Sequence, residues 1–366
     1  MFVELHMIQN FAPSNLNRDD TNNPKDCEFG GVRRARISSQ CIKRAVRLEP
    51  VFSETTQVPT GERTRWLALE IKKKLVEKGK PEKEALEKAV AFVDELLGGM
   101  DSAKPERSKV LFYISEEEKN HIADTLMENW DELNEDKYKN LKKEYEKAFE
   151  NRSSAPDIAL FGRMLADDPK LSLDAASQVA HAISTHRVNM EVDFFTAVDD
   201  LLAEEESGAG MMGVTGFNSA CFYRYSCIDW DQLVRNLNGN TNLAKKTVEG
   251  FLHASVLAVP TGKQTSFAAQ NPPSFMMATV SNEGTCWSLA NAFEKPVSAD
   301  HSHGLIEKSI TALDAYWGNL KLVYGGDHIV TVLSLNGEIP LVNLKDHLVE
   351  NLNTWVSAVL EALPKE

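Results

Sequence analysis

The sequence contains no apolar run that approaches the ~20 residues a membrane-spanning helix needs. Its first residues, FVELHMIQNF, also lack the charged segment followed by an apolar segment that marks a secretory signal. Hydrophobic residues make up 42% of the chain, enough for a substantial core. We therefore expect a cytoplasmic globular protein with one large or two ordinary domains.

Cysteine is scarce, and its spacing suggests no pairs. The five cysteines are odd in number and include no CxxC pair or zinc-like pattern. His181 and His186 lie five residues apart in a stretch that we predict to be helical, and this spacing does not place two imidazoles on one helix face. We expect no metal and no cofactor, and we expect reduced, structural thiols at Cys27, Cys41, Cys221, Cys227 and Cys286.

A nucleotide triphosphate site is also absent from the sequence. Gly262 and Lys263 resemble the end of a P-loop, but that motif needs a glycine where Leu257 stands and a serine or threonine where Gln264 stands. The surrounding segment, VPTGKQTSFAAQNPPSF, is polar and contains Phe267. A loop of this kind can contact RNA through its backbone and through stacking.

The chain is acidic overall, with a formal net charge of -14 and a pI near 5.2. Such a charge usually argues against a nucleic-acid partner. The argument weakens when the acids are segregated from a basic patch, because salt screens exposed charges beyond about 8 Å. The distribution of the basic residues therefore matters more than their number.

The stretch from Phe29 to Arg47 carries six basic side chains and no acid. It begins with Gly30 and Gly31, continues as an extended run with three arginines, and reaches Ser38 or Ser39, either of which would cap a helix. Helical spacing places Ile42, Ala45 and Val46 on one face and Gln40, Lys43, Arg44 and Arg47 on the opposite face. This pattern favours a phosphodiester backbone as the ligand; the alternative is a solvated helix paired with acids elsewhere.

The remaining pattern predicts an α+β fold. Phe2 to Asn10 reads as a strand, and residues 62–150 read as an acidic helical insertion or subdomain. Helical spacing continues over residues 156–188. Strand signals in CFYRYSCI, SFMMATV, CWSLANAF and HIVTVLSL then alternate with helical patterns over 243–257, 305–320 and 344–363. We expect a ferredoxin-like sheet, covered on one face by helices, with large insertions.

Residues 199–220 open acidic and turn glycine-rich, which is typical of a projecting loop or hairpin. Met211 and Met212 lie at its middle. They either contact a flat apolar partner or fold back on the body, and the composition does not separate these two possibilities.

Several segments resemble, in the same order, the CasC family, the backbone subunit of the type I-E CRISPR complex called Cascade. They are LNRDD, FGGVRRARISSQCIKRA, ALFGRML, NMEVDFFTAVDDL, FYRY and VPTGKQTSFAAQNP. The resemblance implies an RNA-recognition-motif-like palm at 1–54, 174–195 and 228–366, helical fingers at 55–173 and a thumb hairpin at 196–227. It also implies that several copies polymerise along a CRISPR RNA with other Cascade subunits, and present the guide to a target DNA strand.

The same resemblance implies roles for individual residues. The guide's phosphates would be held without reading sequence, which suits a protein that accepts any spacer. Three methionines, Met164, Met211 and Met212, would act as apolar wedges at displaced bases. No catalytic residue is implied. The implied RNA-binding residues are Arg18, Arg34, Arg36, Ser38, Gln40, Lys43, Arg44, Arg47, Lys263 and Gln264.

Two alternatives to this function remain open in the sequence. One is a metal-dependent RNA endonuclease in which Asp19 and Asp20 bind magnesium, or in which His6 acts as a general base; Asx-turns and an ion pair with Arg18 are the other interpretation of the two aspartates. The second alternative is a structural oligomer whose basic stretch meets an acidic patch on a neighbouring copy.

Overall fold

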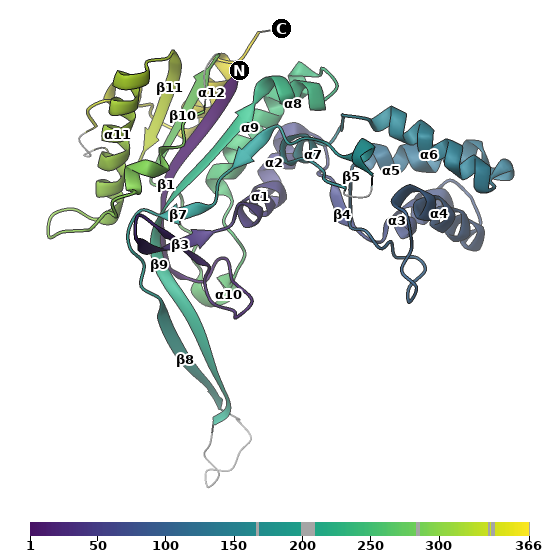
Figure 1. The fold of residues 1–366 in the computed structure, drawn as a ribbon, viewed down its shortest axis with the longest axis horizontal. Helices are drawn as coiled ribbons and strands as arrows, with labels where there is room; N and C mark the ends of the chain where they lie inside the picture. The colour runs from purple at the N-terminus through teal and green to yellow at the C-terminus, as the bar shows by residue number, and fades with distance from the viewer. Residues whose placement is uncertain (166–167, 199–208, 283–285, 336, 338–340, 366) are drawn as a thin grey trace. The chain divides into compact units, whose positions relative to one another are not determined.

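The computed structural model describes residues 1–165, 168–198, 209–282, 286–335, 337 and 341–365. The chain divides into two compact units. The first, here called the sheet unit, comprises Met1–Glu49, Val179–Cys227 and Phe251–Lys365. The second, the helical unit, comprises Pro50–Gln178 and Ile228–Gly250. Figure 1 shows the ribbon of the described residues.

The sheet unit is built on a sheet with the strand order β11-β10-β1-β9-β7-β3-β2, to which β6 and β8 add by pairing with β9. The β1–β10, β10–β11, β2–β3, β3–β7 and β7–β9 pairs are antiparallel. The strands are β1 (Phe2–Ser14), β2 (Asp26–Phe29), β3 (Val32–Ile37), β6 (Ser177–Val179), β7 (Ala182–Ser184), β8 (Glu191–Val198), β9 (Ala209–Asp229), β10 (Phe275–Ser281) and β11 (His328–Ser334).

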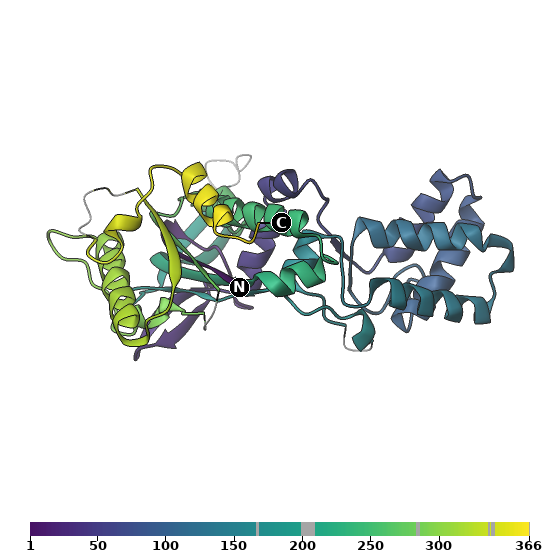
Figure 2. The ribbon, with the colours of Figure 1, turned by 90° about the horizontal axis from the view of Figure 1, so that it is seen from above.

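Helices cover both faces of this sheet at β10, where every residue is buried. Phe275 and Met277 pack in a core with Ile310 and Leu313 of α11 (Leu305–Tyr324), together with η4 (Leu289–Phe293). On the other side, α12 (Leu352–Glu361) contacts β10 and β11, and β11 is seen between α11 and α12 in Figure 2. The predicted α+β class is thus confirmed. The prediction that helices cover only one face of the sheet is wrong.

The helical unit has its own hydrophobic core, formed by the helices predicted over residues 62–150. A short antiparallel pair, β4 (Glu62–Thr64) and β5 (Phe112–Ile114), lies among them. Ser115 and Glu118 form a reciprocal capping box at the start of α5, which explains why that helix begins there. The helices are α2 (Pro50–Thr56), α3 (Leu67–Glu77), α4 (Glu82–Leu97), α5 (Glu116–Glu128), α6 (Glu135–Phe149), α7 (Pro156–Phe161) and α8 (Trp230–Asn236), with short η1 (Trp130–Glu132) and η2 (Pro169–Leu171).

Three predicted elements differ from the structure. The helix predicted over 156–188 ends at Phe161, because Gly162 follows with φ +76° and the chain then forms η2, β6 and β7. The strand predicted in CWSLANAF is the 3-10 helix η4. The helix predicted over 344–363 is shortened to α12, preceded by the single turn η5 (Lys345–His347). The helix over 243–257 is confirmed as α9 (Thr241–Leu257).

The unit boundaries differ from the predicted palm and fingers at residues 50–54, 174–178 and 228–250, which were predicted for the palm and belong to the helical unit. Residues 228–250 belong to the helical unit, because Asn236 in α8 donates hydrogen bonds to the carbonyl oxygens of Ala159 and Asp174, both at 2.8 Å. The projecting hairpin pairs Glu191 with Phe217 and Ala197 with Met211, so it begins before the predicted residue 196. No helix among the described residues is long and apolar enough to cross a membrane.

Candidate nucleic-acid interface

The predicted basic helix is α1 (Ser39–Leu48), and Ser38 is its N-cap, with a side chain that accepts a hydrogen bond from the Cys41 N–H at 3.3 Å. Ile42 and Val46 are buried, and Ala45 is half-buried. On the opposite face Gln40 and Arg44 are exposed, and Lys43 and Arg47 are partly exposed. The two-faced helix predicted from spacing is therefore confirmed. We call Gln40, Lys43, Arg44 and Arg47 the basic face.

A loop rich in asparagine, residues 15–24, lies beside the start of this helix. Asn17 Oδ1 accepts the backbone N–H of Ser38 at 2.8 Å, which fixes the loop against the helix N-terminus. Arg18 is exposed and donates to Asn22 Oδ1 at 2.8 Å. Asp19 Oδ1 accepts from the backbone N–H groups of Thr21 and Asn23 at 2.9 and 3.0 Å. These bonds hold the pKa of the Asp19 carboxyl below its ordinary value, the contact with the Thr21 hydroxyl having the largest effect.

A third segment, the Gly262 loop (residues 260–269), completes one cavity with the other two. Lys263 has a left-handed backbone at φ +51° and is partly exposed. Gln264 donates from its amide to the carbonyl oxygens of Pro260 and Ala269 at 2.9 and 3.3 Å, so it shapes its own loop. The cavity has a volume of about 450 Å³ and is lined by Leu16, Asn17, Arg18, Asp19, Asp20, Asn22, Cys41, Arg44, Ala45, Pro260, Thr261 and Gly262.

Arg34 is not part of this interface, contrary to the sequence prediction. Its side chain is 0% exposed. The guanidinium donates to the carbonyl oxygens of Phe29, Ser184 and Phe293 at 3.1, 3.1 and 2.7 Å, and to that of Glu294 at 3.2 Å. These hydrogen bonds satisfy the buried guanidinium and link β3 to the end of η4. The prediction that Arg34 holds phosphate is therefore wrong.

Arg36 is half-buried on the same strand. Its Nε donates to the carbonyl oxygen of Asp26 at 3.1 Å, and its Nη1 lies 2.9 Å from His181 Nδ1. Burial and the neighbouring Arg36 charge lower the pKa of His181, so that imidazole stays neutral beside the guanidinium. Arg36 thus keeps a polar, partly exposed position on β3.

The projecting hairpin β8–β9 carries Met211 and Met212 on opposite faces. In the register of the two strands, Met212 pairs with Thr196, and Phe194 with Val214; this face is apolar and exposed, with Met212 at 67%. Met211 pairs with Ala197 on the other face and is 60% exposed. The structure thus favours exposure over packing against the body. Figure 1 shows the hairpin extending away from the sheet.

The base of the hairpin contacts both loops of the cavity. Asn15 Nδ2 donates to the carbonyl oxygen of Gly216 at 2.9 Å. A Cβ on Gly216 would lie 2.2 Å from Asn23 Oδ1, so a larger residue there would require the Asn23 side chain to move. The rings of Phe217 and Phe267 are 5.7 Å apart. Hairpin, Asn-rich loop and Gly262 loop therefore form one continuous packed structure.

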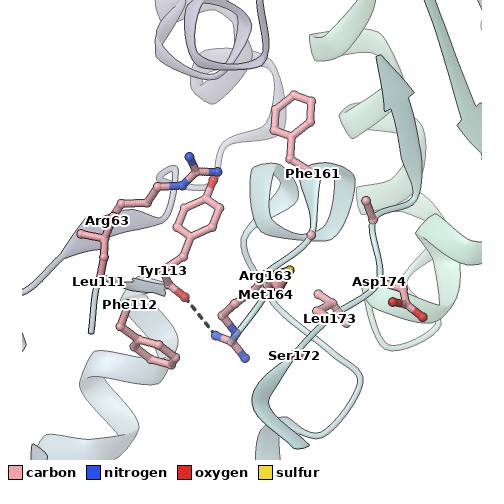
Figure 3. A pocket seen from close by; sticks show the side chains of 12 residues that line it. Arg63, Leu111, Phe112, Tyr113, Phe161, Arg163, Met164, Ser172, Leu173 and Asp174 are labelled. Atoms are coloured by element: carbon pink, nitrogen blue, oxygen red, sulfur yellow. Dashed lines mark hydrogen bonds between the residues drawn. The ribbon is translucent and has the colours of Figure 1, made fainter. Parts of the chain in front are cut away.

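Met164 lies in the helical unit, where it is 89% exposed at the edge of a second cavity of about 530 Å³. The guanidinium of Arg63 lies 4.6 Å from the centroid of the Tyr113 ring on the same cavity. Figure 3 shows these side chains, with the hydrogen bond from Arg163 Nη1 to the Tyr113 carbonyl oxygen at 3.1 Å. Arg163 is buried and is paired with Glu118 at 2.6 Å.

Of the residues suggested for an endonuclease, His6 is not placed for that chemistry. His6 is 0% exposed, burial lowers its pKa to about 3, and its Nδ1 lies 2.9 Å from the Tyr223 hydroxyl. It cannot reach RNA as a general base, so this prediction is wrong. The Asp19 carboxylate forms the predicted Asx-turn, while Asp20 is exposed on the same cavity. Within the described ranges, no three His, Cys, Asp or Glu side chains cluster as metal ligands.

Sequence reasoning missed the residues that organise the cavity. Asn15 and Asn17 position the Asn-rich loop, and Asn17 lies within the LNRDD segment, but nothing in that segment shows which helix the amide contacts. Arg63 and Tyr113, which line the second cavity, were also missed, because they are 50 residues apart and meet only through the β4–β5 pair. No short-range spacing in the chain signals either contact.

Comparison with known proteins places this arrangement in a family. A family model described as CT1975-like protein matches residues 3–358. A chain of a CRISPR RNA-guided surveillance complex, pre-nicking, is 31% identical with a TM-score of 0.87, covering 99% of this chain and 100% of that one. A chain of another CRISPR RNA-guided surveillance complex is 26% identical with a TM-score of 0.76 and the same coverage. No curated protein matches. The resemblance seen in the sequence is confirmed, and the chain belongs to the CT1975-like protein family.

Proposed function

We propose that this protein is a non-catalytic backbone subunit of a type I-E CRISPR Cascade complex, several copies of which polymerise along a CRISPR RNA. The observation that carries the proposal is the cavity at which Arg18, Arg44 and the Gly262 loop meet. The likeness of the whole chain to chains of CRISPR RNA-guided surveillance complexes supports this function. In this proposal the sheet unit is the RNA-recognition-motif-like palm, the helical unit corresponds to the fingers and β8–β9 to the thumb.

The exposed basic groups suit a phosphodiester ligand. Arg18 and Arg44 line the cavity, and Gln40, Lys43 and Arg47 extend the row along α1, with Lys263 on the Gly262 loop. Arg36 and the capped N-terminus at Ser38 add donors at the start of the helix. Contacts of this kind hold an RNA backbone without reading bases. Base pairing with the target DNA strand would then supply specificity, as in another RNA-guided effector.

The hairpin supports association between copies. Val192, Phe194, Met212 and Val214 form one exposed apolar face, and an exposed apolar surface of this kind suits contact with another molecule. Identical copies that contact one another head to tail, without closing into a ring, form an open filament that can extend along the RNA. Met164, Met211 and Met212 are then placed at the surface, where a thioether can press on a base plane without demanding a particular base.

The proposal is tested by expressing the chain with a CRISPR RNA and measuring RNA binding over a range of salt concentrations. We expect co-purified RNA, and we expect Arg44→Ala to weaken binding for every guide sequence and to reduce the salt slope by ~0.7 per lost phosphate contact. Lys83→Ala, at an exposed position on α4, is the matched control. An unchanged slope for Arg44→Ala would remove this residue from the interface.

The non-catalytic part of the proposal has a separate test. The protein with bound RNA is incubated with labelled RNA and magnesium, and the products are separated by length. We expect intact RNA, because the Asp19 carboxylate is already occupied by its Asx-turn. Cleavage that Asp20→Ala abolishes would instead establish the endonuclease.

A further inference from the structure

Cys227 and Cys286 lie with their sulfur atoms 2.7 Å apart, although they are 59 residues apart in the sequence. This separation is only about 0.7 Å longer than a disulfide bond. Cys227 is on β9 and is 3% exposed, whereas Cys286 precedes η4 and is half-buried. No disulfide joins them in this structure. Their spacing in the sequence fits no known motif, so the pair is visible only in the structure.

A second contact independently holds the two segments together. The buried carboxylate of Glu4 accepts hydrogen bonds from the Tyr225 hydroxyl and from the Trp287 backbone N–H, each at 2.7 Å. Tyr225 lies two residues before Cys227 on the same face of β9, and Trp287 follows Cys286 directly. The closeness of the two thiols is therefore set by the packing of the sheet on the 286–293 segment.

The other buried cysteine has different surroundings. The thiol of Cys221 lies 3.8 Å from the Ser309 hydroxyl, and burial raises its pKa to about 11, which keeps it protonated and unreactive. Cys27 and Cys41 are half-buried, and burial raises the pKa of each of these thiols too. The geometry therefore singles out Cys227 and Cys286.

We infer that Cys227 and Cys286 form an oxidation site, at which a peroxide converts the two thiols into an intrachain disulfide. The more exposed Cys286 sulfur attacks one peroxide oxygen and the O–O bond breaks. Cys286 becomes a sulfenic acid, and the departing hydroxide leaves as water with the thiol proton. The Cys227 sulfur then attacks the sulfenic sulfur, and an S–S bond forms while a second water departs. Two electrons pass from the thiols to hydrogen peroxide.

The bond would close a large loop between β9 and the 286–293 segment. Closing such a loop restricts the unfolded chain, so the oxidised protein should unfold at a higher temperature than the reduced protein. The added link also runs parallel to the Glu4 contacts, so oxidation fastens segments that are already adjacent and need not disturb the sheet.

The test uses the full chain, purified in a reductant, desalted and treated with hydrogen peroxide. After denaturation and alkylation, the reduced chain should carry five maleimide adducts, one for each of its five cysteines, and the oxidised chain two fewer, with the loss of two hydrogens in the intact mass. Peptide mapping should recover the Cys227–Cys286 link. The unfolding temperature should rise by several degrees and return after reduction.

Three variants make the test decisive. Cys286→Ser should keep all of its adducts after peroxide. Cys227→Ser should form no link, and dimedone should label its Cys286, which stops at the sulfenic acid. Cys27→Ser, the matched control, should still lose two adducts. Five adducts on the oxidised wild-type chain, or a link that joins a different pair, would overturn the inference.

Discussion

The carbonyl oxygen of Leu16 occupies the space that a side chain at Gly262 would need: a Cβ built on Gly262 would lie 2.3 Å from it. The two residues are 246 positions apart, and both line the cavity beside α1. This contact joins the Asn-rich loop to the Gly262 loop backbone to backbone. The width of the proposed RNA groove is therefore set by the absence of one methyl group.

Gly262→Ala should push these two loops apart. Because the obstructing atom is backbone, the neighbour cannot rotate away, and we expect a loss of about 1–3 kcal/mol in the free energy of unfolding. RNA binding should weaken as well, since Arg18 and Lys263 would be displaced. Urea unfolding and RNA titration measure the two effects. Gly337→Ala, where nothing lies within 4 Å of the added atom, is the control and should change neither.

Substitution of Arg34 and of Arg44 should separate stability from binding. Arg34→Ala leaves four carbonyl contacts unmade inside the sheet unit, so we expect a loss of more than about 3 kcal/mol in unfolding free energy. Arg44→Ala removes an exposed side chain and should change stability by less than about 0.5 kcal/mol while lowering RNA affinity. The opposite pattern, a stable Arg34→Ala that no longer binds RNA, would return Arg34 to the interface.

The two adjacent methionines of the hairpin should not be equivalent. Met212 continues the apolar face of Phe194 and Val214, whereas the face of Met211 includes Asp193, and there the Phe195 ring covers Gly213. We therefore expect Met212→Ala to reduce the periodic protection of a bound CRISPR RNA from nuclease more strongly than Met211→Ala does. Footprinting of the assembled protein measures this. Equal footprints would show that neither face is preferred.

Stability should depend on pH through His6. Burial lowers the pKa of the folded-state imidazole to about 3 from its ordinary value of 6.5, so below pH 6.5 the unfolded chain takes up a proton that the folded chain does not. Stability due to His6 is complete above pH 6.5 and falls as the pH decreases. Between pH 7 and pH 5 the loss should be about 2 kcal/mol.

His6→Gln isolates this contribution, because glutamine keeps a polar group near the Tyr223 hydroxyl and does not titrate. The wild-type chain should lose more unfolding free energy than the variant between pH 7 and pH 5, as measured by urea unfolding at each pH. The same loss in both proteins would assign the pH dependence to other groups. Comparison with the variant also cancels the effects of His186 and His328, whose pKa values are lowered too.

Local patterns predicted α1 correctly because its evidence is local. The Ser38 cap, the buried pair Ile42 and Val46 and the opposite basic face all lie within one helix and need no knowledge of the fold. The same reasoning predicted the helices of the helical unit over residues 62–150, and the acidic, glycine-rich composition predicted the projecting hairpin. These features follow from local sequence alone.

Features set by distant contacts were not predictable in the same way. Arg34 looks identical to its neighbours in the sequence, and only carbonyl groups from residues 184, 293 and 294 reveal that it is buried. Glu4 and His6 read as the exposed side of a strand, but Glu4 is covered by the segment at Trp287, and His6 lies against the tyrosines of β9, so both are buried. The predicted end of the helix over 156–188 was wrong for a related reason, because the later residues of that range pair with β9 as short strands.

Strand β9 runs without interruption from the projecting hairpin into the sheet, over 21 residues. Its hairpin portion, from Phe217 to Ala209, is about 26 Å long at the rise of an extended chain. The hairpin would therefore tilt as one rigid segment about its base, where Asn15 contacts Gly216. A tilt of about 5° at that point moves the far end by about 2 Å over such a length. In an assembly of identical copies, the helical pitch would then be governed by the stiffness of a single strand at one glycine.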